Sequence, residues 1–253
     1  MTTLGIGFIN IYIGDFDDKT KEIIDYFSIN INQTAWFNTL TAYYEIDTYG
    51  SQIYFINSTT FFSSVYLSVD KGTILNEAKI EELIFEGILN GNLTLDSNSI
   101  YTIMFSGDFV AEYRGKKWLQ DWCGFHGAFR LPSSDVITYS VIGNPATAAA
   151  SPSLGTACMP LGSRPTANGD AGADSMIAIY AAQLASAVTN FVGAWYADED
   201  GKECGSACDG DFGALDLRDT SGVNHNLVVG KRQYLVQSLW QPGFGCTMEM
   251  RSE

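Results

Sequence analysis

The chain has little histidine and few basic residues, and both shortages exclude functions. His126 and His225 are the only histidines among 253 residues, so one chain cannot supply a three-histidine metal site. Lys and Arg total 14 against 29 Asp and Glu, which gives a formal charge of −15. Because such a surface repels phosphate backbones and anionic lipid headgroups, we predict that nucleic acid is not a partner.

The sequence also lacks the local signatures of common catalytic and membrane proteins. It contains no Gly-x-Ser-x-Gly elbow, P-loop, Rossmann fingerprint or Ser-x-x-Lys box. No apolar run reaches the roughly 18 residues that cross a bilayer, so we predict no membrane insertion. The opening "MTTLGIGFINIYIGDF" has no basic region and no small-residue cleavage site, so a secretory signal is not expected within this numbering.

Several features that are present favour the secretory route. Asn-x-Ser/Thr triplets occur at Asn32, Asn57 and Asn92, which are candidate N-glycosylation sites. Low Lys content and an abundance of Tyr, Thr, Ser and Asn point the same way, as does the presence of five cysteines. We therefore predict an extracellular protein.

The five cysteines are an odd number for an oxidised chain. "CGSAC" could contribute to a zinc site, but no second Cys or His pair of matching spacing exists. We predict that Cys123 pairs with Cys158 and Cys208 with Cys246, each bond contributing about 3–4 kcal/mol through loop closure. Cys204 would then be a free thiol or pair with another molecule.

Hydrophobic periodicity predicts interleaved strands and helices. The expected strands lie at residues 4–13, on either side of a break at 57–60 within 51–69, at 99–106 and 135–143, and in two closing strands near the C-terminus. The expected helices cover 17–29, 34–44, 76–91 and about 174–189, with long loops at 144–173 and 197–222. Without a clear linker, this pattern predicts one α/β domain over residues 1–253, built from a mixed sheet with packed helices.

Few side chains suggest chemistry. His126 in "CGFHG" is interpreted as a hydrogen-bonded packing residue in a glycine-flanked turn, since nearby Cys123 is expected to be bridged. Asp198 and Asp200 in "DEDGKE" are candidate calcium ligands, although the distal Glu of an EF-hand is missing. Asp174 is predicted to cap the helix that follows it. No other cofactor is expected.

A resemblance covers nearly the whole chain. The run "NGDAGADSMIAIYAAQLASAVTN", with "WCGFHG" and "YSVIGNPAT" before it and "ACDGDFG" after it, resembles the EXORDIUM and phosphate-induced protein 1 family. The segments "INIYIGDF", "WFNTLTAYY" and "LDSNSIYTIMFSGDF" are also similar to that family's amino-terminal half. The resemblance implies a secreted protein of the extracellular matrix or cell wall, linked in plants to growth and cell expansion, without an established catalytic activity.

The same resemblance bears on catalysis. Some relatives carry a His-Glu-x-x-Glu-like or His-Glu-x-x-His-like helix, similar to that of a zincin, in which the first His and a residue four positions later bind zinc and the Glu polarises water. The aligned residues here are Ala182, Gln183 and Ser186. The resemblance therefore implies a zincin-like core whose degenerate active-site helix cannot hold a catalytic ion.

We predict from these features a noncatalytic structural protein of the extracellular matrix or cell surface that associates with copies of itself, with other matrix proteins or with polysaccharide. Two alternatives stay open. One is a divergent hydrolase, either a metallopeptidase that uses acidic residues with His126 or a glycosidase that uses paired carboxylates from residues 198–219. The other is a carbohydrate-binding protein whose aromatic side chains stack on sugars.

Overall fold

A five-stranded mixed sheet forms the centre of the computed structural model, which describes residues 5–147, 158–159, 166–190, 196, 199–214 and 224–251. The strand order is β4-β1-β6-β10-β9. The four parallel strands are β4 (Thr59–Leu67), β1 (Ile6–Ile13), β6 (Ser99–Phe105) and β10 (Val136–Gly143), and the antiparallel edge strand is β9 (Gly124–Arg130). The α/β class and the mixed sheet predicted from the sequence are confirmed.

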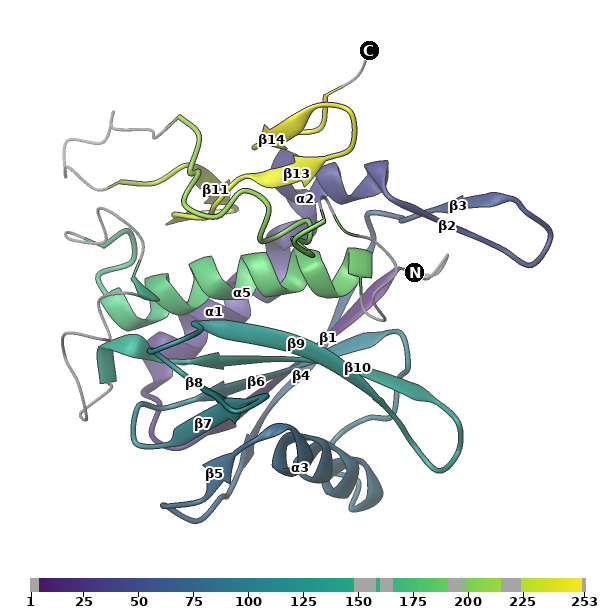
Figure 1. Cartoon of the computed structure of the whole chain (residues 1–253). Helices are drawn as coiled ribbons and strands as arrows, with labels where there is room; N and C mark the ends of the chain where they lie inside the picture. The colour runs from purple at the N-terminus through teal and green to yellow at the C-terminus, as the bar shows by residue number, and fades with distance from the viewer. Residues whose placement is uncertain are drawn as a thin grey trace.

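Helices cover both faces of this sheet (Figure 1). Helices α1 (Asp18–Asn30) and α5 (Ala171–Asn190) pack on one face, and α3 (Glu77–Leu89) packs on the other. The central strands are buried on both sides, which is why their sequences are nearly continuous apolar runs. Along β1, Phe8 and Tyr12 belong to the core on the α1 and α5 side, whereas Ile9 and Ile11 belong to the core on the α3 side.

A third layer lies over α1 and α5 and is built largely from the C-terminal hairpins (Figure 1). These hairpins are β11 (Leu227–Val229) with β12 (Arg232–Tyr234), and β13 (Leu239–Gln241) with β14 (Gly245–Thr247). The hydroxyl of Tyr234 donates to the carbonyl of Ile23 in α1, 3.0 Å away. Helix α5 is therefore enclosed between the sheet and this layer.

The remaining elements are short. They are η1 (Ile31–Gln33), α2 (Ala35–Asn38), η2 (Thr39–Ala42), the hairpin β2 (Tyr44–Ile46) and β3 (Gln52–Tyr54), the sheet β5 (Ile74–Leu75), β7 (Val110–Tyr113) and β8 (Lys116–Lys117), and η3 (Pro145–Thr147). Within the described residues, no helix is long and apolar enough to span a membrane.

The structure corrects three expectations about elements. The helix predicted over 34–44 is divided into α2 and η2, because burial of its aromatic side chains in the core outweighs the local helical spacing. The segment 122–131, in which a turn was expected at His126, contains strand β9, because pairing with β10 holds its glycine-rich backbone extended. Helix α5 begins at Ala171, three residues earlier than predicted, which shortens the loop expected over 144–173.

Candidate functional site

The start of α5 is held by a different carboxylate from the one predicted. Asp170 accepts hydrogen bonds from the backbone N–H groups of Gly172 and Ala173, both at 3.0 Å, and so caps the helix. The prediction that Asp174 is the cap is wrong, since Asp174 lies one turn inside the helix. It accepts instead from the backbone and side-chain N–H groups of Asn168, at 2.9 and 2.6 Å. Burial raises the pKa of the Asp174 carboxyl.

Further along α5, the face that carries positions 182 and 186 is covered by protein backbone. The N–H of Gly205 donates to the hydroxyl of Ser186 at 3.2 Å. A Cβ atom on Gly205 would lie only 2.0 Å from the carbonyl oxygen of Ala182, so the two backbones are in close contact. The Cys208–Cys246 disulfide anchors the loop that contains Gly205. The loop backbone therefore packs against this face, and Ala182 and Gly205 together line the edge of a hollow beside the contact.

Gln183 points to a separate group of polar side chains. Its Oε1 lies 3.1 Å from Nδ1 of His126 on β9, and Nε2 of His126 lies 3.4 Å from Oε1 of Glu203. Asn190, two turns after Gln183 on α5, donates from Nδ2 to the same Glu203 oxygen at 2.8 Å. One strand, one helix and one loop thus bring together four residues, which we call the His126 cluster: His126, Gln183, Asn190 and Glu203.

The electrostatics of the His126 cluster keep its carboxyl group ionised. Burial raises the pKa of Glu203, but hydrogen bonds from His126, Asn190 and Ser186 and the charge of His126 together outweigh burial, so the pKa is lowered. Glu203 is therefore a hydrogen-bond acceptor at neutral pH. A general acid requires the opposite shift, toward a raised pKa.

Two hollows lie on either side of Gln183. One, of about 850 Å³, is bounded by residues 124–128 of β9, by the His126 cluster, and by Tyr113 and Arg114 at the β7–β8 turn. The other, of about 720 Å³, is bounded by the Cys123–Cys158 disulfide and by the loop around Gly205. Gly124 and Gln183 line both hollows.

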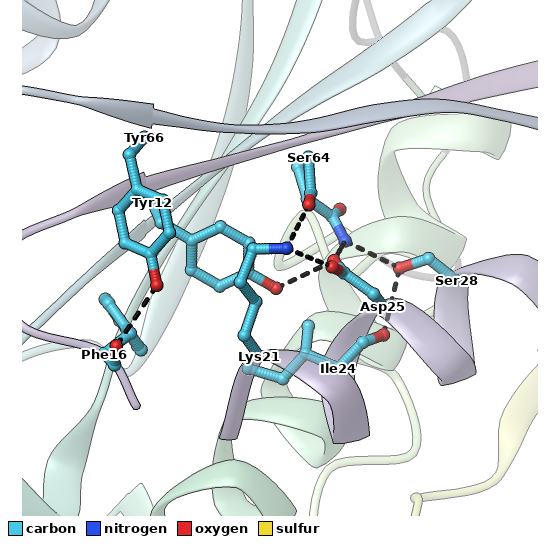
Figure 2. A network of polar contacts seen from close by, with 9 residues as sticks. Tyr12, Phe16, Lys21, Ile24, Asp25, Ser28, Ser64 and Tyr66 are labelled. Atoms are coloured by element: carbon cyan, nitrogen blue, oxygen red, sulfur yellow. Dashed lines mark hydrogen bonds and ion pairs between the residues drawn. The ribbon is translucent and has the colours of Figure 1, made fainter. Parts of the chain in front are cut away.

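A second polar group occupies the opposite end of the sheet (Figure 2). Asp25 of α1 accepts hydrogen bonds from Nδ2 of Asn10 at 2.8 Å and from the hydroxyl of Tyr12 at 2.9 Å, and its other oxygen pairs with Nζ of Lys21 at 2.7 Å. Lys21 also donates to Ser64 on β4. Burial, followed by the charge and hydrogen bond of Asp25, raises the pKa of Tyr12, which therefore remains a neutral donor.

A polar row across all five strands connects the two groups. Its members are Ser64, Asn10, Thr102, Ser140 and His126, each paired in register with the next. The hydroxyl of Ser140 donates to that of Thr102 at 3.0 Å. Sequence reasoning missed this row, although each of the three central strands carries a single polar residue at the position concerned, within "INI", "YTI" and "YSV".

The predicted cysteine pairings agree with the structure. Cys123 is bonded to Cys158 and Cys208 to Cys246, and Cys204 is a free thiol. Because Cys204 is fully buried, this conformation does not present it to another molecule.

The calcium candidates are not brought together with other ligands. Asp200 is exposed and Asp198 lies outside the described residues. In the part of the chain that the structure describes, no three His, Cys, Asp or Glu side chains are grouped as metal ligands.

The three sequons differ in exposure. Asn92 is exposed just after α3, and Asn32 is partly exposed. Asn57 donates from Nδ2 to Oδ1 of Asn38 at 3.3 Å, so its amide group already makes a contact within the fold. Of the three side chains, Asn92 is the best placed to carry a glycan.

Comparison with known proteins identifies the family. The model of the phosphate-induced protein 1 conserved region matches residues 5–248. The chain belongs to this family. Among members of the phosphate-induced protein 1 family, the chain is similar to Protein EXORDIUM-like 3 of Arabidopsis thaliana, with 28% identity over 269 residues that cover 91% of this chain and 75% of the relative. It is also similar to Protein EXORDIUM-like 5 of Arabidopsis thaliana, with 26% identity over 279 residues that cover 92% of this chain and 72% of the relative. No solved structure gives a significant match.

Proposed function

We propose that this member of the phosphate-induced protein 1 family is a noncatalytic secreted protein that acts by binding partners in the extracellular space. The main observation in support of this proposal is the contact of Gly205 with Ala182 and Ser186. In a zincin, the equivalent helix face holds zinc and borders an open substrate cleft. Here the side chains at that face are a methyl and a hydroxyl group, and the loop backbone at Gly205 occupies the space next to Ser186.

The arrangement of the sheet supports a zincin-like ancestry for the core. Four parallel strands are followed by one antiparallel edge strand, β9, and the buried helix α5 packs against β9 and β10. Gln183, at the position of the zincin glutamate, offers an amide oxygen to His126. An amide cannot act as the general base that activates water.

The state of Glu203 argues against a glycosidase at the larger hollow. Such an enzyme needs a carboxylic acid with a raised pKa and a second carboxylate about 5–10 Å away. The pKa of Glu203 is lowered instead, and Glu203 is the only carboxylate among the described residues that line this hollow.

Two further features support an extracellular binding role. Two disulfides are expected in a protein that matures in an oxidising compartment. Exposed tyrosine and isoleucine side chains are concentrated on the β2–β3 hairpin, where Tyr44, Ile46, Tyr49 and Tyr54 are available for contacts with matrix components.

The proposal is tested on protein purified from a secreting host. Elemental analysis should find no stoichiometric zinc, and panels of peptides and of wall glycosides should not be hydrolysed. Any weak turnover that is seen should come from a contaminating enzyme. It should therefore be equal in the wild type and in the His126→Asn and Glu203→Gln variants. Turnover that is lost in either variant, or that a chelator abolishes, would establish a hydrolase and overturn the proposal.

A further inference from the structure

The larger hollow follows the free edge of a β-strand. Five consecutive residues of β9, Gly124 to Ala128, line it. On its inner side β9 pairs with β10, and β9 is the last strand of the sheet. An edge strand carries backbone N–H and C=O groups that can pair with another extended chain.

The hydrogen-bond register identifies the outward-facing groups. The N–H of Leu131 donates to the carbonyl of Asp135 at 2.8 Å, just beyond the last pair of the β9–β10 ladder. Residue pairs in an antiparallel ladder alternate between bonded and non-bonded, so Gly124, His126 and Ala128 direct their backbone groups away from β10. Among the described residues, no backbone group outside β10 bonds to these three.

The walls of the hollow have the form of a groove that would hold an extended chain. Helix α5 contributes Gln183 and Asn190 to one wall, seven residues apart along the helix. The other wall carries Tyr113, whose ring stacks on Phe125 with centroids 4.2 Å apart and an interplanar angle of 16°. Strand addition between an edge strand and a helix is a recurring mode of peptide recognition.

The charged side chains around the groove indicate which kind of extended segment it would bind. Glu203 is an ionised carboxylate beside the groove, and the chain has a formal charge of −15. Arg114, on the opposite wall, lies over the Tyr113 ring, 5.0 Å from its centroid. A negative protein attracts cationic ligands at long range, and a basic side chain opposite Glu203 would form an ion pair there.

We propose that the groove between β9 and α5 binds an extended, lysine- or arginine-containing segment of a partner protein, which joins the sheet as an additional strand. Backbone pairing to Gly124, His126 and Ala128 supplies the register, and Glu203 selects a basic side chain. This inference rests on the proposed function, since the segment is bound and not cleaved.

The test measures fluorescence anisotropy with a labelled, end-capped peptide of alternating threonine and lysine, about eight residues long, matching the period of two in a strand. The full chain should bind this peptide and should bind the threonine–glutamate counterpart much more weakly. Two further peptides carry N-methyl groups either on every threonine nitrogen or on every lysine nitrogen. Because a strand pairs through one edge, one isomer should lose binding and the other should retain it.

Two pairs of protein variants complete the test. Ala128→Pro removes an outward N–H without changing the hydrogen bonds to β10, and it should abolish peptide binding. Arg130→Pro is the control, because it removes an outward N–H of β9 outside the hollow and should leave peptide binding intact. Glu203→Gln should weaken binding of the lysine peptide about tenfold, equivalent to about 1.4 kcal/mol, whereas Glu199→Gln should have little effect.

Specific outcomes would overturn the inference. Absence of binding, equal binding of both N-methyl isomers, or binding that Glu203→Gln leaves unchanged would each exclude basic strand addition in this groove. If Ala128→Pro loses its fold by circular dichroism, the N-methyl isomers and Glu203→Gln decide the question. Mass spectrometry would detect cleavage of the bound peptide. Such cleavage would contradict the noncatalytic proposal and would leave the assignment of the groove as a peptide-binding site in place.

Discussion

Nδ1 of His126 lies 3.1 Å from Oε1 of Gln183, across the contact between β9 and α5. The amide group of Gln183 on α5 is thus engaged with an imidazole on the neighbouring strand. The same imidazole contacts Glu203 through its other nitrogen. Through His126, these two contacts tie α5 to the edge of the sheet and to the loop that follows α5.

Glu203→Gln should lower the free energy of unfolding at pH 7 by about 2 kcal/mol, because hydrogen bonds to a charged group are lost. The folded-state pKa of Glu203 lies below the ordinary value of a glutamate, so the stabilisation by its charge is present above that ordinary value and is lost as the pH falls through the folded-state pKa. Urea unfolding as a function of pH should therefore show the variant and the wild type converging in acid. A constant difference down to strongly acidic pH would contradict this assignment.

Asp25→Ala should destabilise the protein by about 3 kcal/mol or more, because it leaves Asn10, Tyr12 and Lys21 without their shared acceptor. Asp15→Ala is the matched control. Asp15 is 86% exposed and pairs with Lys71 at 3.6 Å, so its loss should cost less than about 1 kcal/mol. Chemical denaturation at neutral pH compares the two, and similar values would show that the network in Figure 2 contributes no more than a surface ion pair.

Gly205→Ala should cost about 3 kcal/mol, since the new methyl group meets the carbonyl of Ala182. Gly50→Ala is the control, because it sits at φ +82° with nothing within 4 Å and introduces only backbone strain of about 1–2 kcal/mol. Thermal unfolding should rank Gly205→Ala as the less stable variant. If Gly205→Ala melts like the wild type, the loop is not packed on α5 and the contact that supports the proposed function is wrong.

Cys204 should be unreactive in the native protein. Its side chain is fully buried, and burial raises the pKa of the thiol to about 12, so almost no thiolate exists at pH 8. Ellman's reagent should modify one thiol per chain only after unfolding in urea without reductant. Fast modification of the folded protein, or dimers that persist on a non-reducing gel, would show that Cys204 is accessible.

Much of the fold could be predicted from local patterns. Strands β1, β6 and β10 are apolar runs bounded by polar residues, and α1 and α3 have apolar side chains at helical spacing after a side-chain cap. Strand β9 escaped prediction because glycines and His126 give "GFHGAFR" little intrinsic preference for an extended strand. Asp174 was predicted as the cap of α5, and only the hydrogen bonds from the N–H groups of Gly172 and Ala173 identify Asp170 in its place.

The amino-acid sequence by itself determined the α/β class, the family, and the absence of histidine and carboxylate side chains at Ala182, Gln183 and Ser186, since residue type alone sets which zinc ligands a position can offer. Only the tertiary structure decided that Gly205 packs against this helix face and that His126 joins Glu203 beside an open strand edge. These contacts join segments that lie 19 or more residues apart in the chain. Their formation depends on strand pairing and on the burial of α5 from both sides, which no local pattern encodes.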